Sequence, residues 1–465
     1  MIRLDNIQRI YFIGIGGIGM SALARYFSSQ GKMVSGYDRT ETALTRQLTG
    51  EGIEVMYEDN VNTAPADTQL VIYTPAIPDD HKQFNYYRDN NYPLAKRSEV
   101  LGAITESSFN ICVAGTHGKT TISTMIAHIL RDSGYGCNAF LGGIATNYNS
   151  NFWSNERNTC VIEADEYDRS FLKLSPDIAV ITAMDADHLD IYGTESAMQD
   201  AFVEFAGKIK SGGTLVVKKG LARDKEFEMG NILRYGINDS SADVYAHNVK
   251  MMNGYYLFDV TVSNAPVEDV ALNMGGLHNV ENASVAIAIA KKLGIGDEAI
   301  KNAVEDFKGV KRRFEYIVKK KNLVYVDDYA HHPEELSALI SSARNLFSGL
   351  KCTVIFQPHL FTRTRDLADQ FAKSLDLADE VLLLPIYPAR ELPISGVTSE
   401  IIKNKLGTKA RILSKEELLD EFRRAAIPSM EEGAAKSLMK GLLITAGAGD
   451  IDTLVQPIKK ILSAS

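Results

Sequence analysis

The chain has 465 residues, of which 45% are hydrophobic and 23% charged, a composition typical of a soluble globular protein with several cores. Its formal net charge of -9 argues against a nucleic-acid backbone or an acidic membrane surface as the main partner. At roughly 150 residues per domain, the length predicts about three domains.

The cysteines and the N-terminal stretch indicate where the protein works. Four cysteines lie far apart and form no C-x-x-C pair, which fits a reducing compartment better than a disulfide framework or a zinc site. Residues 1–9 lack the basic start and long apolar stretch of a signal peptide, and no run approaches the ~20 apolar residues of a membrane helix. We therefore expect a cytoplasmic monomer or weak homodimer that binds neither nucleic acid nor a membrane.

Short β-rich runs recur along the whole chain. In chain order they are Arg9–Ile15, Gln69–Tyr73, Phe109–Ala114, Thr159–Glu163, Ile178–Thr182, Thr214–Val217, Leu323–Val326, Cys352–Phe356, Glu380–Leu384 and Gly441–Thr445. Segments with helical periodicity lie between many of them, for example Met20–Gln30, Thr120–Asp132 and Asn279–Leu293. Apolar strands that alternate with helices predict an α/β fold, with parallel sheets covered on both faces.

Domain boundaries follow from the strand-to-helix turns. Two glycine-bearing turns, Gly14–Gly19 and Gly115–Lys119, lie about a hundred residues apart, and each looks like the first turn of its own α/β unit. A third unit begins with the strand after residues 308–314. We predict domains at residues 1–105, 106–315 and 316–465.

The first turn reads Gly-Ile-Gly-Gly-Ile-Gly and satisfies G-x-G-x-x-G between a strand and a helix. Asp38 follows the last glycine by about twenty residues. This fingerprint predicts a pyrophosphate at the helix N-terminus and a ribose on Asp38. It recognises a pyrophosphate-sugar shape and does not require nicotinamide, so any nucleoside diphosphate fits. The alternative is a tight turn without a ligand.

The second turn, Val113-Ala-Gly-Thr-His-Gly-Lys-Thr-Thr, predicts a phosphate-binding loop for ATP and Mg²⁺. Its glycines let successive N–H groups point at phosphate oxygens, and the following helix adds its partial positive charge. Lys119 can bridge the β- and γ-phosphates, and the Thr120 hydroxyl can ligate Mg²⁺. Val113 stands where the usual pattern has glycine. The alternative, a glycine turn before a surface lysine, does not explain the order of strand, loop and helix.

Carboxylates and a histidine follow two neighbouring strand-like runs. Glu163 and His188 lie where ligands bind in parallel sheets and are predicted to share a metal that neutralises a transferring phosphoryl group. For Asp165, Glu166 and Asp185 we favour helix capping or a solvated loop.

Further polar clusters occur later in the chain. His278 and Asn279 open a helix of small residues, where they either hold adenine or cap the helix. His331 follows a later strand beside a second histidine, although adjacent histidines rarely converge on one ion without other close ligands. His359 and Arg363 follow the next strand, and the arginine there can grip a carboxylate.

Together these motifs resemble those of the Mur ligase family of peptidoglycan synthesis, over essentially the whole chain. The matching stretches begin at Gly14, Gly115, Glu163, Asp187, His278, Arg312, Asp327 and Gln357. Asp-Asp-Tyr-x-His-His-Pro followed by Gln-Pro-His is similar to the branch that adds L-alanine to UDP-N-acetylmuramate. The alternative is the recycling branch, which attaches a preformed tripeptide to the same UDP-sugar. An NAD-dependent oxidoreductase or a P-loop switch leaves most of the motifs unexplained.

The resemblance implies a fold of three domains and an activity. The domains are a Rossmann-like domain for the UDP-sugar, a central P-loop ATPase domain with a parallel-rich sheet, and a Rossmann-like C-terminal domain that closes as a lid on the amino-acid side. The implied activity is ATP-dependent joining of a carboxylate to an amine through an acyl phosphate.

The resemblance also assigns residues. The residues assigned to binding of the UDP-sugar are Gly14, Gly16, Gly17, Ile18, Gly19, Asp38, Thr74 and Ala76. Those assigned to ATP binding are Gly115, Thr116, His117, Gly118, Lys119, Thr120, Thr121, His278, Asn279, Asn282, Arg313 and Asp328. The implied metal ligands are Thr120, Glu163 and His188, and the implied catalytic residues are Lys119, His188, Arg313, His331, His359 and Arg363.

Two positions depart from the wider family pattern. Several sister ligases carry a carbamylated lysine about fourteen residues after the histidine that matches His188, and here that position is Phe202. No such lysine is therefore expected, which is also how the alanine-adding branch differs. Leu360 stands where relatives often have arginine, so more of any carboxylate binding falls to Arg363.

Overall fold

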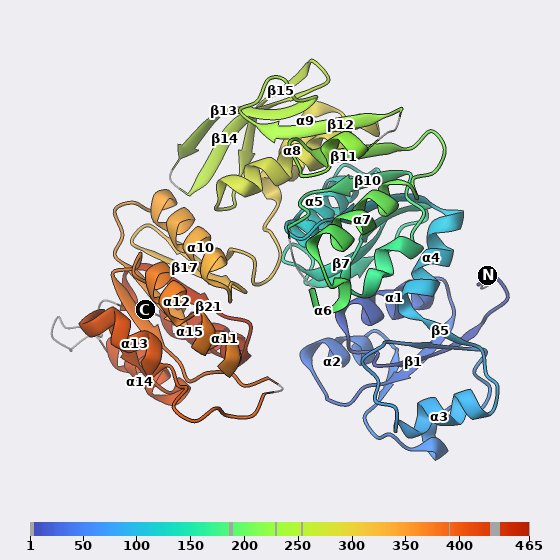
Figure 1. Ribbon diagram of the computed structural model, residues 1–465, viewed down its shortest axis with the longest axis horizontal. Coiled ribbons are helices and arrows are strands. Elements are labelled where there is room, and N and C mark those ends of the chain that lie inside the picture. The colour runs from blue at the N-terminus through green and yellow to red at the C-terminus, as the bar shows by residue number, and fades with distance from the viewer. Residues whose placement is uncertain are drawn as a thin grey trace. The chain divides into compact units, whose positions relative to one another are not determined.

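A computed structural model describes residues 4–185, 189–227, 230–252, 254–389, 391–427 and 438–464. The chain forms two compact units (Figure 1). The first comprises residues 1–248, 258–270 and 281–307, and the second comprises residues 249–257, 271–280 and 308–465. The domain boundaries near residues 105 and 315 stay a prediction.

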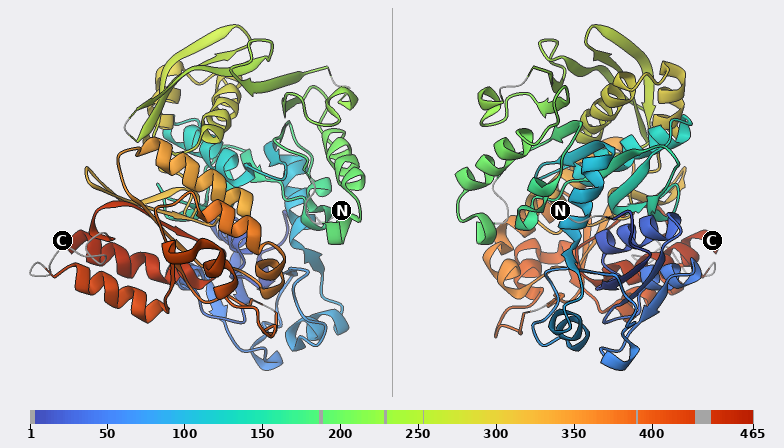
Figure 2. Two further views of the ribbon diagram at one scale, coloured as in Figure 1. Left: turned by 60° about the vertical axis from the view of Figure 1, so that its left-hand side comes forward. Right: turned by 90° about the vertical axis from the view of Figure 1, so that its right-hand side faces the viewer.

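The N-terminal sheet is parallel throughout, with strand order β3-β2-β1-β4-β5. Its strands are β1 (Arg9–Ile13), β2 (Met33–Tyr37), β3 (Glu54–Met56), β4 (Leu70–Tyr73) and β5 (Leu94–Lys96). Its helices are α1 (Ile18–Ser29), α2 (Ala43–Gly50), α3 (Lys82–Asp89) and α4 (Arg97–Ser107), drawn in blue in Figures 1 and 2. The order reverses at β1, so the carboxyl ends of β1 and β4 open a crevice of the kind in which such sheets bind ligands.

The central sheet has ten strands in the order β15-β14-β13-β12-β11-β10-β6-β9-β7-β8. They are β6 (Phe109–Ala114), β7 (Asn138–Ala145), β8 (Ser150–Trp153), β9 (Thr159–Glu163), β10 (Ile178–Ile181), β11 (Thr214–Lys218), β12 (Ile232–Ile237), β13 (Val244–Met252), β14 (Tyr255–Val262) and β15 (Ala265–Leu272). The helices are α5 (Lys119–Asp132), α6 (Leu189–Tyr192), α7 (Glu195–Ala206), α8 (Leu277–Lys292) and α9 (Asp297–Asp306). Because β6 pairs in parallel with both β9 and β10, the polar residues after these three strands meet at one edge.

Within the first unit, the N-terminal and central sheets share one hydrophobic core. The Tyr26 ring of α1 lies 5.3 Å from the Phe140 ring of β7, measured between centroids. Buried Arg25 donates to Glu51 over 2.7 Å and also binds Asn151 of β8. Each fully buried phenylalanine contributes about 1.5–3 kcal/mol, so this core holds the first glycine turn firmly against the central strand ends.

The C-terminal sheet has the order β16-β17-β21-β18-β19-β20, and β16 is its antiparallel edge strand. Its strands are β16 (Glu315–Lys320), β17 (Leu323–Asp328), β18 (Cys352–Phe356), β19 (Glu380–Leu383), β20 (Ala410–Ile412) and β21 (Gly441–Ala446). Its helices are α10 (Pro333–Leu346), α11 (Phe361–Asp366), α12 (Ala368–Leu375), α13 (Glu400–Leu406), α14 (Lys415–Ala425) and α15 (Val455–Ala464). Tyr325 and Ile355 share a core with α14 and α15, whereas Phe356 packs on Phe371 of α12. Helices thus cover both faces, as predicted.

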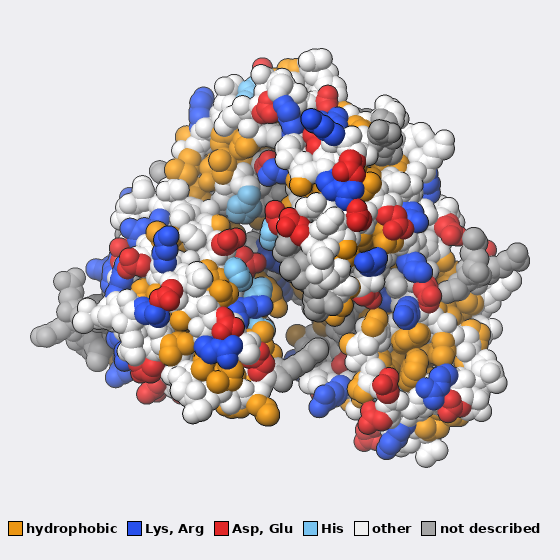
Figure 3. Space-filling view, viewed as in Figure 1, with side chains coloured by type: hydrophobic (Ala, Val, Ile, Leu, Met, Phe, Trp, Pro, Cys, Tyr) orange, Lys and Arg blue, Asp and Glu red, His pale blue; other side chains and the backbone are white. Residues whose placement is uncertain are grey.

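The surface matches the composition. On the face shown in Figure 3, the described acidic and basic side chains are interspersed. No described helix has the length and apolar character to cross a membrane. The four cysteines are buried and unpaired.

Candidate active site

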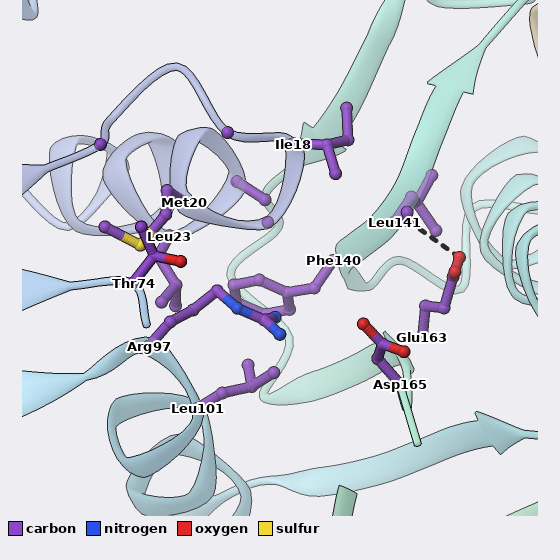
Figure 4. A pocket seen from close by; sticks show the side chains of 15 residues that line it. Ile18, Met20, Leu23, Thr74, Arg97, Leu101, Phe140, Leu141, Glu163 and Asp165 are labelled. Atoms are coloured by element: carbon purple, nitrogen blue, oxygen red, sulfur yellow. Dashed lines mark hydrogen bonds between the residues drawn. The ribbon is translucent and has the colours of Figure 1, made fainter. Parts of the chain in front are cut away.

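A cavity of about 350 Å³ lies in the first unit, between the first glycine turn and the carboxyl ends of the central strands (Figure 4). It is lined by Gly14, Gly17, Ile18, Gly19, Met20, Ala22, Leu23, Thr74, Arg97, Leu101, Phe140, Leu141, Gly142, Glu163 and Asp165. Five of the eight residues predicted for the UDP-sugar are in this set, together with the predicted metal ligand Glu163. The other three, Gly16, Asp38 and Ala76, are not.

The glycine turn is built for close approach of a ligand. Gly14 has a φ of +85°, and a Cβ there would lie 2.9 Å from the Thr74 methyl carbon, so only glycine fits. The Gly16 N–H donates to Asp38 Oδ2 over 2.7 Å, which means that this carboxylate fixes the turn. A contact between Asp38 and a ribose stays a prediction. Helix α1 begins at Ile18 without an acidic residue in its first turn, which leaves its positive N-terminal end available for an anion.

The phosphate loop is held from behind by Thr182, which follows β10. The Thr182 hydroxyl donates to the carbonyls of Ala114 and His117, the first over 3.3 Å. Gly115 has a φ of +127°, and a Cβ at this position would overlap Thr182. Gly118 adopts a left-handed conformation as the N-cap of α5. These contacts and backbone conformations fix the shape of the loop.

Lys119 is tied to the protein. Its ammonium donates to the Gly115 carbonyl over 2.8 Å and to Glu166 Oε1 over 2.7 Å. Glu166 is 1% exposed, so its interpretation as a solvated loop residue is wrong, and although it stands at the N-cap of a 3-10 helix, its side chain forms no capping hydrogen bond. Burial raises the pKa of Glu166, while the Lys119 charge lowers it. A nucleotide phosphate must compete with this carboxylate for Lys119.

The oxygen atoms of Thr120 and Glu163 meet beside the loop. The Thr120 hydroxyl donates to Glu163 Oε1 over 3.0 Å, and Glu163 Oε2 accepts the Gly142 N–H over 2.9 Å. A Cβ at Gly142 would overlap that carboxylate, so the glycine leaves room for it. Burial raises the pKa of Glu163, and the charge of Lys119 opposes this shift. Hard oxygen donors of this kind fit Mg²⁺.

The remaining predicted metal ligand, His188, lies outside the described residues. Among the residues that are described, no group of three or more His, Cys, Asp or Glu side chains is arranged to hold a metal ion. Asp165 accepts the Tyr167 N–H over 3.1 Å, and Asp185 is 73% exposed, in agreement with the capping and solvated readings.

The predicted adenine residues differ in exposure. Asn279 is buried and donates to the Gly275 carbonyl over 2.6 Å, whereas His278 is exposed. Asn282 reaches the phosphate loop, because its Oδ1 would lie 3.2 Å from a Cβ placed on Gly118. Contact of any of these residues with adenine stays a prediction.

In the second unit, Asp328 organises the basic turn before β16. Its carboxylate accepts the N–H groups of Phe314 and Ala330 over 2.6 and 2.7 Å. Both arginine guanidinium groups lie over the Tyr329 ring, and Arg312 also lies 3.4 Å from Asp327. Arg312 is therefore bound to the sheet through Asp327, whereas Arg313 lies at the surface.

His331 follows β17, whereas His359 and Arg363 follow β18, and β21 lies between these two strands in the C-terminal sheet. The two imidazole rings lie 6.1 Å apart between centroids, and the His359 ring stacks on Tyr387. Burial lowers the pKa of His359, and the charges of His331 and Arg363 lower it further, so its imidazole is neutral at neutral pH. Within the described structure, His359 Nδ1 and Arg363 Nη1 are buried without a hydrogen-bond partner. Such atoms require a ligand or water to satisfy them.

The two departures from the family pattern have structural counterparts. Phe202 is fully buried and its ring lies 5.3 Å from Phe171, so an apolar core fills the position of the carbamylated lysine. Leu360 has a φ of +70°, which is rare for a bulky residue, and its N–H donates to the Tyr387 carbonyl over 2.9 Å.

Sequence reasoning did not single out Arg97, Glu166 as a partner of Lys119, or Thr182. Arg97 and Thr182 each follow a strand at the ligand-binding edge of a parallel sheet, and that position was the available signal.

Comparison with known proteins identifies relatives of the chain. The catalytic-domain description of the Mur ligase family matches residues 9–108, the Mur ligase middle domain matches residues 113–290, and the Mur ligase glutamate ligase domain matches residues 312–449. The chain is 47% identical to UDP-N-acetylmuramate–L-alanine ligases of Flavobacterium johnsoniae and Flavobacterium psychrophilum, in each case over 99% of both chains.

A solved structure is similar along the same length. The UDP-N-acetylmuramate–alanine ligase of Thermotoga maritima is 28% identical, with a TM-score of 0.81 over 98% of this chain and 100% of that one. The predicted α/β fold of three domains is thereby confirmed. The chain belongs to the Mur ligase family.

Proposed function

We propose that the protein joins L-alanine to the lactyl carboxylate of UDP-N-acetylmuramate at the expense of ATP, in the synthesis of peptidoglycan precursors. The observation that carries this proposal is the cavity of the first unit, which runs from the glycine turn to Glu163. A nucleotide sugar anchored at the turn directs its far end toward the residues that hold the nucleotide phosphates. The full-length similarity to L-alanine ligases supports the same activity.

The chemistry needs activation of the carboxylate, because amide formation in water is uphill. The lactyl carboxylate attacks the γ-phosphorus of ATP, forming a carbon–oxygen–phosphorus linkage while ADP leaves. The amine of L-alanine then attacks the acyl carbon, and inorganic phosphate departs. Lys119 and Arg313 stabilise the negative charge on the phosphoryl oxygens, mainly through position and electrostatics.

Thr120 and Glu163 would hold Mg²⁺, and His188 belongs to the same proposal. When bound, the ion would neutralise charge on the nucleotide phosphates. Other proposed ATP contacts come from the loop glycines, from Asn282, and from Asp328 through the ribose. The predicted domain boundaries and a cytoplasmic location are parts of the same proposal.

The amine substrate binds at His331, His359 and Arg363 in this proposal. A free amino acid carries a carboxylate, and the buried Nη1 of Arg363 has no hydrogen-bond partner among the described residues. The guanidinium can bind that carboxylate, while the neutral imidazole of His359 offers a polar contact without added charge.

Phosphate release from ATP, with each substrate omitted in turn, tests the proposal. Release should require both UDP-N-acetylmuramate and L-alanine, and the product should contain one added alanine by mass. If the tripeptide L-alanyl-D-glutamyl-diaminopimelate replaces L-alanine with a higher kcat/KM, the protein is a recycling ligase instead. Release without any UDP-sugar would reject both.

A further inference from the structure

Arg97 stands at the ligand-binding edge of the N-terminal sheet. In the register of the parallel strands, Ile13 pairs with Tyr73, and Tyr73 pairs with Lys96. The next residue along each strand therefore belongs to one row, formed by Gly14, Thr74 and Arg97. This row places a cation beside the turn that begins the fingerprint.

The Arg97 side chain extends into the cavity. Figure 4 shows it reaching from the start of α4 past Phe140, on the same side of the cavity as Leu101 and facing Glu163 and Asp165. A Cβ on Gly19 would lie 2.9 Å from Arg97 Nη1, so the guanidinium packs on the first turn of α1. Because Gly19 has no side chain, the Arg97 guanidinium has room to pack at this position.

The Arg97 guanidinium is unpaired within the described part of the chain, where no residue forms a hydrogen bond or an ion pair with its side chain. This sets Arg97 apart from buried Arg25, whose guanidinium binds Glu51 and Asn151. A half-buried cation with five N–H donors, beside the positive end of a helix, favours the binding of an anion between them.

We propose that Arg97 binds the diphosphate of the UDP-sugar and thereby positions the sugar, so that its lactyl group points toward Glu163. This inference rests on the function proposed above. A guanidinium can bind two phosphate oxygens at once, and the N–H groups at the start of α1 bind others. Arg97 is a positioning residue, because it contacts the nucleotide diphosphate and not the reacting carboxylate.

Calorimetric titration without ATP tests the assignment with two ligands. UDP-N-acetylmuramate has both the diphosphate and the lactyl carboxylate, whereas UDP-N-acetylglucosamine has the diphosphate alone. Arg97→Gln should weaken both ligands about ten- to hundredfold, the range expected for lost charge-assisted hydrogen bonds. Arg97→Lys should restore part of the affinity. Arg88→Gln is the matched control, since Arg88 pairs with Asp89 on the exposed face of α3.

Kinetics add a second readout. Arg97→Gln should raise the KM for UDP-N-acetylmuramate with a smaller change in kcat, and its thermal midpoint should stay within about 2 °C of wild type, since no hydrogen bond or ion pair with a described residue is lost.

Other outcomes overturn the inference in distinguishable ways. Unchanged affinity for both ligands shows that Arg97 is idle while the proposed function stands. A loss confined to UDP-N-acetylmuramate assigns Arg97 to the lactyl carboxylate instead. Failure of the wild-type protein to bind UDP-N-acetylmuramate rejects the proposed function and this inference together.

Discussion

In the phosphate loop, Lys119 and Thr120 each bind a carboxylate of the protein, whereas at the end of β18 the buried Nη1 of Arg363 has no partner among the described residues. Lys119 and Thr120 are thus paired within the protein, so a ligand must displace an existing contact, although Thr116 Oγ1 and Glu166 Oε2 are buried without a hydrogen-bond partner among the described residues. Arg363 Nη1 has no such contact to be displaced, so a ligand can complete its hydrogen bonding. A buried polar group without a partner costs about 1–3 kcal/mol. A ligand that pairs with Arg363 removes this cost, whereas a ligand at Lys119 first has to replace a contact that already exists.

Lys119→Ala should have the largest effect. Removal of the ammonium eliminates the charge that stabilises the transferring phosphoryl group, so turnover should fall at least about a thousandfold. Phosphate release with saturating substrates measures this loss. The affinity for UDP-N-acetylmuramate should change less than about threefold, because the cavity is not lined by Lys119.

Lys208→Ala is the control for this variant, since Lys208 forms an exposed ion pair with Glu204 on the surface. Near-normal turnover of Lys119→Ala would contradict the assignment of the loop.

Arg363→Ala should come next and should act on L-alanine. Because Arg363 Nη1 has no hydrogen-bond partner among the described residues, its loss should remove little from the stability of the protein. We expect kcat/KM for L-alanine to fall about a hundredfold, with the KM for ATP nearly unchanged. Steady-state rates over a range of L-alanine concentrations measure this, and exposed Arg365, paired with Asp366, supplies the control variant. A drop in thermal midpoint as large as the loss of activity would show a structural role instead.

Asp327→Asn concerns a paired group whose contacts support the fold. Burial raises the pKa of Asp327 from 3.8 to about 7, against the opposing effects of Thr445 and Arg312. Since the folded pKa lies above the unfolded one, this contribution to stability is complete below about pH 4 and is lost as pH rises through 7.

Thermal midpoints at pH 5 and pH 8 test this sign. The wild-type thermal midpoint should be lower at pH 8 than at pH 5. Asp327→Asn should reduce this difference by the equivalent of about 1–3 kcal/mol. Glu380→Gln serves as a comparison, because its carboxylate is mostly buried in the same sheet and shared between Lys351 and Arg411. An equal fall in the variant and in the wild type would contradict the raised pKa.

The sequence predicted the loop, the fingerprint and the strand ends well because each is a local pattern with a physical cause. Parallel strands read as continuous apolar runs, as in β6 and β18. Strands β13 to β15 were missed, because β14 carries tyrosine and leucine on its less buried face and so hides the alternation.

The partners of site residues were harder to predict than the residues themselves. The pairing of Lys119 with Glu166 joins positions 47 apart, and no spacing rule gives it. Asp38 and Asp328 also hold backbone N–H groups of a turn, a role that the sequence did not indicate, while their contacts with riboses stay predictions. Which acceptor a carboxylate meets depends on tertiary packing, which one sequence does not display.

Glu166→Gln should have the smallest effect of these variants, and whether it strengthens or weakens ATP binding is informative. The ionised carboxylate competes with the nucleotide phosphates for Lys119 and also repels them. Glutamine removes that charge but keeps an oxygen that can accept from Lys119. We therefore expect ATP, titrated in the presence of Mg²⁺ and without UDP-sugar, to bind about three- to tenfold more tightly. Glu195→Gln, which changes net charge equally at the exposed start of α7, should leave the affinity unchanged. Weaker binding by Glu166→Gln would mean that the carboxylate places Lys119 for the phosphates, and that the paired loop is preorganised for ATP instead of being closed against it.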